Sequence, residues 1–103
     1  MKYFTYDERL GIHTPDLHQS WELYSSHEQA AILSQWENIR GTIPDRILAI
    51  EQTINTKQDQ LSLEEDFERS CELNWEIASH ASVINDLWLW YRTAEHVTNK
   101  AHT

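Results

Sequence analysis

Glycine, proline and cysteine are scarce in this sequence, and each scarcity excludes a class of protein. Two glycines, two prolines and one cysteine occur in 103 residues. A single cysteine, Cys71, excludes an internal disulfide framework and a cysteine-based zinc site, and it favours a reducing compartment. Two isolated glycines, Gly11 and Gly41, exclude a glycine-rich phosphate loop and a Gly-x-Ser-x-Gly nucleophile turn. We therefore expect no enzymatic activity and predict no catalytic residue.

Basic residues and long apolar runs are also scarce. Eight Lys and Arg residues oppose seventeen Asp and Glu residues, which gives a net charge of −9, and the basic residues never form a run. Nucleic acids and anionic membranes are bound by locally concentrated Lys and Arg, so neither is an expected partner. The N-terminus has no signal-peptide core, and no stretch approaches the roughly 20 apolar residues of a membrane span. The expected location is the cytoplasm.

The apolar and aromatic residues that are present suffice for one hydrophobic core. Hydrophobic residues make up 40% of the chain and include five Trp, four Tyr and two Phe. This length suits a single helical domain, 1–103. Its pattern indicates an extended aromatic arm over 1–14, short helices over 15–41 and a helical hairpin over 43–98. The predicted fold is all-α: a small helical bundle built on a long, coiled-coil-like antiparallel hairpin, with one or two additional N-terminal helices.

The longest predicted helix runs from Ser62 to Val97, a stretch without glycine or proline. Ser62 and Glu65 have the spacing of a capping box, which would start the helix. Its apolar and small residues recur at steps of three and four, as on one helix face. The members of this stripe are Phe67, Ser70, Asn74, Ile77, Ala81, Ile84, Trp88 and Tyr91. We expect one uninterrupted helix with the preceding segments packed along it.

The helix before it carries the clearest heptad pattern in the chain. Its members are Ile43, Ile47, Ile50, Ile54, Lys57 and Leu61, with the four-three spacing of a coiled-coil seam. Lys57 has two interpretations, as a residue that fixes the register or as a stem on the rim with its charge in water. Leu61 directly precedes Ser62, so the connection should be tight. The far half of the longer helix then needs cover from the 26–40 helix, the aromatic arm or a homodimer partner.

Two further helices are expected before residue 42. Thr14 and Pro15 form a helix-start signal, and the apolar spacing that follows predicts a short helix to about Tyr24. Ser25 and Glu28 form a capping box for the next helix. Gly41 is expected to end that helix in the left-handed conformation.

Candidate partner-binding residues come from an acidic stretch and an aromatic run. Carboxylates at the start of the long helix either stabilise its dipole or form a docking patch for a basic partner. The run from Trp88 to Tyr91 sweeps a full helical turn, so it is either buried all round or presents Trp90 to a partner. The possible partner-binding residues are Glu64, Glu65, Glu68, Glu72, Glu76 and Trp90.

The functional hypothesis is a non-enzymatic interaction or regulatory protein that binds another protein or itself, without a cofactor. One alternative is a metal-binding bundle or small helical enzyme that uses His and Glu residues. Glu72, Glu76 and His80 step by four along the predicted helix, which is the nearest match to helical metal ligands and equally a solvated stripe. A second alternative is an acidic mimic of nucleic acid that occupies a basic groove.

Overall fold

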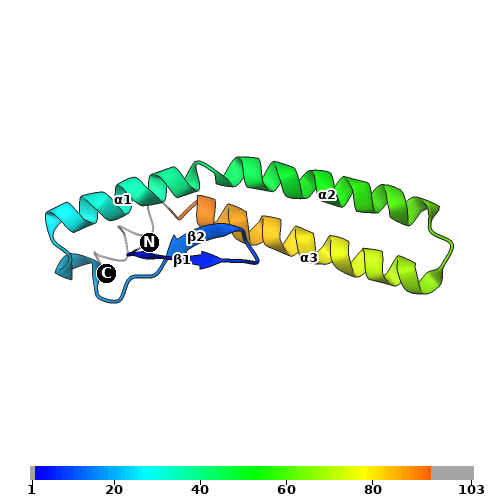
Figure 1. Cartoon of the computed structure of the whole chain (residues 1–103), viewed down its shortest axis with the longest axis horizontal. Coiled ribbons are helices and arrows are strands. Elements are labelled where there is room, and N and C mark those ends of the chain that lie inside the picture. Colours follow the sequence, from blue (N-terminus) through cyan, green and yellow to red (C-terminus); the bar gives the residue numbers. More distant parts are fainter. Residues whose placement is uncertain (1, 94–103) are drawn as a thin grey trace.

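The computed structural model describes residues 2–93 and shows a mostly helical fold. Its elements are β1 (Phe4–Asp7), β2 (Ile12–Pro15), the 3-10 turn η1 (Trp21–Leu23), α1 (Ser26–Arg40), α2 (Ile43–Leu63) and α3 (Phe67–Tyr91). α1 and α2 follow one another as a long bent helix, α3 runs back along α2, and the two strands lie beside α1 and α3 (Figure 1). Within the described part of the chain, no helix has the length and apolar character needed to cross a membrane.

The N-terminal segment is a β-hairpin, so the predicted all-α fold is confirmed only as a mostly helical one. Within the predicted extended arm over 1–14, β1 and the start of β2 pair as strands. β1 and β2 are antiparallel, with Phe4 opposite Pro15 and Asp7 opposite Ile12. The turn closes where the Gly11 N–H donates to the Asp7 carbonyl at 2.7 Å, with Gly11 at φ +75°. Each strand has only four residues, too short for its alternation to stand out from a loop.

The predicted helix over 15–24 is also wrong, because tertiary contacts hold this segment extended. β2 continues to Pro15, and the Asp16 N–H then donates to the Tyr3 carbonyl at 2.9 Å. Further on, the His18 N–H donates to the hydroxyl of the buried Tyr24 at 3.2 Å. Only the three residues of η1 are helical in this segment.

α1 begins as predicted. The Glu28 N–H donates to the Ser25 hydroxyl at 3.1 Å, and the Ser25 N–H donates to the Glu28 carboxylate at 3.2 Å. The Tyr3 hydroxyl donates to the same carboxylate at 3.0 Å, which ties the start of the hairpin to the start of α1. The Ser25 N–H, and after it the Tyr3 hydroxyl, hold the pKa of Glu28 below its ordinary value.

The junction between α1 and α2 differs from the prediction. Gly41 has φ −62° and ψ −20°, and Thr42 is also in the right-handed region, so the chain bends without a left-handed cap. The Thr42 hydroxyl donates to the Ile39 carbonyl at 2.7 Å. Pro44 and Asp45 lie in the first turn of α2, as predicted.

α3 is uninterrupted from Phe67 to Tyr91, but it begins later than predicted. Ser62 lies in the last turn of α2, and Asp66 caps α3 by accepting from the Glu68 N–H at 3.2 Å. The sequence therefore contained two competing caps, and the later one is used. The helix ends at Tyr91, whereas the rest of the predicted stretch to Val97 lies partly outside the described residues.

The buried face of α3 coincides only in part with the predicted stripe. Leu73, Val83 and Leu87 are buried, whereas Asn74 and Ala81 of the predicted stripe are exposed. Ile84, Trp88 and Tyr91 of the stripe are partly buried against the core. On α2, the predicted seam is confirmed for its first three residues, which are buried: Ile43, Ile47 and Ile50.

The hydrophobic core lies at the end of the molecule where the hairpin, α1 and the second half of α3 meet. Trp36 of α1 is 1% exposed and stacks on Phe4 with ring centroids 6.4 Å apart. Trp90 of α3 packs edge-on against Trp36 at 5.7 Å. The far half of α3 is therefore covered by both α1 and the aromatic N-terminal segment.

Alanine substitutions at the two glycines should change stability in opposite directions. A Cβ at Gly11 would lie 2.7 Å from Arg46 Nε, and the positive φ costs roughly 1–2 kcal/mol for an L-residue, so Gly11→Ala should lower the free energy of unfolding. A Cβ at Gly41 meets no heavy atom closer than 3.4 Å, so Gly41→Ala should raise the free energy of unfolding by about 0.4–1 kcal/mol. Urea denaturation of both variants measures this, and a destabilised Gly41→Ala protein contradicts the right-handed junction.

Candidate functional site

The end of the molecule opposite the core is a pair of helices with little buried between them. We call residues 51–82 the distal helix pair; they comprise the end of α2, the connecting loop and the start of α3 (Figure 1). Leu73 is the single buried residue in this range. The radius of gyration is 17.9 Å, against about 13 Å for a compact domain of this length. This projecting pair therefore exposes the faces that a compact fold would cover.

The exposed tryptophan of this pair is Trp75, whose exposed fraction is 71%. Trp90, the aromatic residue singled out from the sequence, is instead partly buried against Trp36. The difference arises because α1 and the hairpin cover the end of α3 and leave its beginning open. Trp75 was missed because it stands alone between the polar residues Asn74 and Glu76, off the predicted stripe.

A groove of about 530 Å³ runs between α2 and α3 beside Trp75. We call it the distal groove. Its α2 and α3 walls are partly apolar, and two arginines stand at the end nearest the hairpin. The lining residues are Arg9, Arg46, Ala49, Ile50, Thr53, Trp75, Ser79, His80 and Val83.

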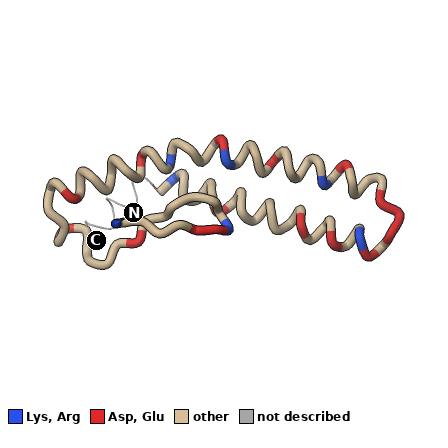
Figure 2. The backbone as a smooth tube through the Cα atoms, viewed as in Figure 1, with Lys and Arg blue, Asp and Glu red and all other residues tan. Residues whose placement is uncertain are grey.

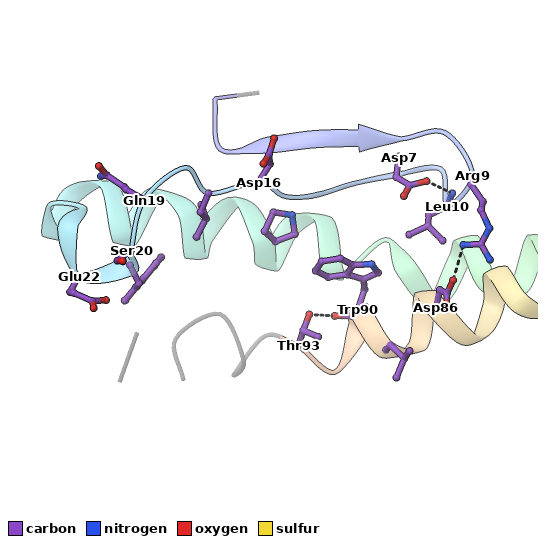
Figure 3. A pocket seen from close by; sticks show the side chains of 14 residues that line it. Asp7, Arg9, Leu10, Asp16, Gln19, Ser20, Glu22, Asp86, Trp90 and Thr93 are labelled. Atoms are coloured by element: carbon purple, nitrogen blue, oxygen red, sulfur yellow. Dashed lines mark hydrogen bonds and ion pairs between the residues drawn. The ribbon is translucent and has the colours of Figure 1, made fainter. Parts of the chain in front are cut away.

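The two arginines reach the groove because the turn of the hairpin docks on both helices. Arg46 Nε of α2 donates to the Leu10 carbonyl at 3.0 Å. Arg9 pairs with Asp86 of α3 at 2.7 Å (Figure 3). Arg46 has no carboxylate within ion-pair distance among residues 2–93, so it retains an uncompensated positive charge.

The predicted acidic residues gather at the other end of the distal helix pair (Figure 2). Glu64 and Glu65 lie in the loop, Glu68 in the first turn of α3, and Glu72 one turn later. The Glu64 carboxylate accepts from the backbone N–H of Asp66 at 3.1 Å and so helps to order the loop. Glu68 and Glu72 precede Trp75 by seven and three residues, which places all three on one side of α3.

Glu76, by contrast, joins the two helices. Its carboxylate lies 3.1 Å from Lys57 Nζ, and the two side chains are 31% and 22% exposed. The hydrogen bond from Lys57 is the main cause that lowers the pKa of Glu76, with the charge of Arg69 at 3.5 Å adding to it. The charge of Lys57 is thus paired across the seam, rather than hydrated at its rim.

The residues of the metal hypothesis are not assembled into a site. Glu76 is held by Lys57, and His80 lines the distal groove one turn away. Within residues 2–93, no group of three or more His, Cys, Asp or Glu side chains is arranged to hold a metal ion. His96 and His102 lie outside the described residues.

A larger hollow of about 960 Å³ lies between the hairpin, the 16–22 segment and the end of α3 (Figure 3). Its main charged groups are engaged with one another or with the backbone. Arg9 pairs with Asp86, and the Asp7 carboxylate accepts from the Leu10 N–H at 3.0 Å. No His or Cys occurs among its described lining residues. These contacts hold the hairpin on α3 and leave the distal groove as the better candidate site.

The pairing of Glu76 with Lys57 should make stability depend on pH. Glu76 has a folded pKa below its ordinary value of 4.5, so the unfolded chain takes up this proton first as pH falls. The stabilisation is fully present above 4.5 and is lost as pH falls through the folded pKa. Glu76→Gln should therefore lower the free energy of unfolding at neutral pH, and this difference should disappear in acid.

Urea denaturation across this pH range measures the effect, with Glu72→Gln as the control. Among residues 2–93, Glu72 pairs only with Arg69 on its own helix, and it is 65% exposed, so its removal should matter less. Equal effects of the two substitutions at every pH contradict the role of the Lys57 pair.

Comparison with known proteins identifies no relative for this chain. No family model matches it, and neither a curated protein nor a solved structure is significantly similar.

Proposed function

We propose that this chain is a non-enzymatic protein-interaction protein whose binding surface is the distal helix pair. The observation that carries the proposal is Trp75, which is 71% exposed and lines the distal groove. Tryptophan is prominent among the residues that dominate binding energy in protein interfaces. The lining of the groove suits binding, because Ala49 and Val83 offer apolar contact beside the charge of Arg46.

The proposal includes a coiled-coil-like mode of association. Ile47 and Ile50 continue through Ile54 to Lys57, so α2 carries a heptad seam toward the loop. The seam becomes less buried along this path, and the Lys57–Glu76 pair replaces apolar contact between the helices. The exposed apolar side chains of such a helix pair become buried when a third or fourth helix packs beside it.

A cytoplasmic location is part of the same proposal. Cys71 is exposed and free on α3, four residues before Trp75. Thiols of this kind persist in reducing compartments and are oxidised or cross-linked elsewhere.

The test is partner capture with the full chain immobilised, in three versions. The wild type and Leu48→Ala should retain the same bound protein, whereas Trp75→Ala should lose it by about tenfold or more, as expected for a residue that dominates binding. Leu48 is a matched control because it is 55% exposed on α2 and does not line the distal groove. Equal capture by all three versions contradicts the proposed surface.

A further inference from the structure

We infer that the distal groove is occupied by the distal helix pair of a second copy of this chain. The two copies would pack antiparallel about a twofold axis close to Trp75. This inference rests on the proposed function, because it names the partner of the same surface. Three observations on the distal helix pair carry it: the order of its charges, their spacing along α3, and its deficit of buried residues.

The two ends of the face that contains the groove differ in charge. At the end next to the hairpin, Arg9 is paired with Asp86, whereas Arg46 has no carboxylate within ion-pair distance among residues 2–93. Trp75 lies farther along the groove. Glu72 and Glu68 then continue the same side of α3 toward the loop. The stretch 57–76, which includes the loop, has seven carboxylates and two basic residues. The face therefore carries one unpaired positive charge, Arg46, at one end and is acidic at the other.

The spacing of these charges makes the face complementary to itself. Phe67 precedes Trp75 by eight residues and Val83 follows it by eight, which is about 12 Å in each direction at 1.5 Å per residue. A twofold rotation at Trp75 thus places the Phe67 level of one copy against the Val83 level of the other. Glu68 and the acidic loop then face the end that holds Arg46, and Trp75 meets its own symmetry mate. Such isologous contacts are the rule in homodimers.

The same arrangement separates the like charges. The two acidic loops would lie about 27 Å apart along the helix axes, from nine residues on each side of Trp75. This separation exceeds about three Debye lengths at physiological salt, so their mutual repulsion is screened. A chain with a net charge of −9 can therefore associate with itself in this orientation, although a parallel arrangement would oppose the acidic ends directly.

The pair also lacks the apolar burial that a second copy supplies. Leu73 is the only buried residue from 51 to 82, whereas the core end buries residues of α1, α2, α3 and the hairpin together. Two such pairs packed face to face form a four-helix arrangement, in which the exposed Trp75 side chains become central.

Sedimentation and light scattering of the full chain over a range of concentrations test the inference. The wild type should form a dimer whose dissociation constant rises with salt, because the end contacts are ionic. Trp75→Ala should raise that constant by about tenfold or more, whereas Leu48→Ala should leave it unchanged. A wild type that stays monomeric at all concentrations, or a dimer that Trp75→Ala does not weaken, overturns the inference.

Charge reversal tests the orientation. Arg46→Glu alone and Glu68→Arg alone each place like charges at both ends of a homodimer, so each should weaken association. A mixture of the two variants contains one reversed pair and one native pair, and it should recover the wild-type dissociation constant as a heterodimer. Recovery supports the antiparallel arrangement, and a mixture no tighter than its components overturns it.

Arg46 also binds the Leu10 carbonyl, so thermal unfolding of Arg46→Glu is measured alongside. If that variant is destabilised, Thr53→Glu replaces it in the mixture. Thr53 is exposed and lines the groove, and within residues 2–93 its side chain bonds only to the Ala49 carbonyl.

Failure of the inference and of the proposed function are distinguishable. A monomeric chain that still captures another protein through Trp75 overturns self-association alone, and loss of Trp75 dependence in both assays overturns both.

Discussion

The packing of Trp36 between Phe4 and Trp90 is the contact on which the arrangement of this protein depends. It joins the hairpin, α1 and the end of α3 with ring centroids 6.4 and 5.7 Å apart, and Trp36 itself is 1% exposed. A buried tryptophan removes more apolar area from water than any other side chain, so three segments distant in sequence are joined by one residue. As a consequence, the hairpin and α1 pack over one end of the α2–α3 pair. They are too short to reach the loop between α2 and α3 as well.

That asymmetry generates the candidate site. Beyond Ile50 and Val83 the two long helices are joined by Leu73 and by the pair of Lys57 with Glu76. A partly exposed ion pair contributes little to stability compared with buried apolar area, but it specifies which residues oppose one another. The turn of the hairpin places charged groups beside the two helices. It brings Arg9 to Asp86 of α3, and its Leu10 carbonyl accepts from Arg46 of α2. The groove and the position of Arg46 beside it thus follow from where the hairpin ends.

Local signals in the sequence were sufficient where a few neighbouring residues decide the outcome. The capping box of Ser25 and Glu28, the start of α2 with Pro44 in its first turn, and the buried Ile43, Ile47 and Ile50 are all correctly predicted. Where two local signals competed, the sequence alone was ambiguous. Asp66 rather than Ser62 starts α3. Gly41 adopts the right-handed conformation at the bend between α1 and α2, although glycine could equally have formed a left-handed cap.

The sequence by itself therefore determined that the chain is mostly helical and which residues begin most of its helices, because capping and periodicity act over a single turn. Only the tertiary structure decided that residues 4–15 form a β-hairpin, that Trp90 is partly buried against Trp36 and that Trp75 is exposed. Periodicity identifies an apolar residue without identifying what covers it. Which residues are covered depends on contacts between segments far apart in the chain. In this protein, the β-hairpin and α1 cover one end of the longer pair formed by α2 and α3.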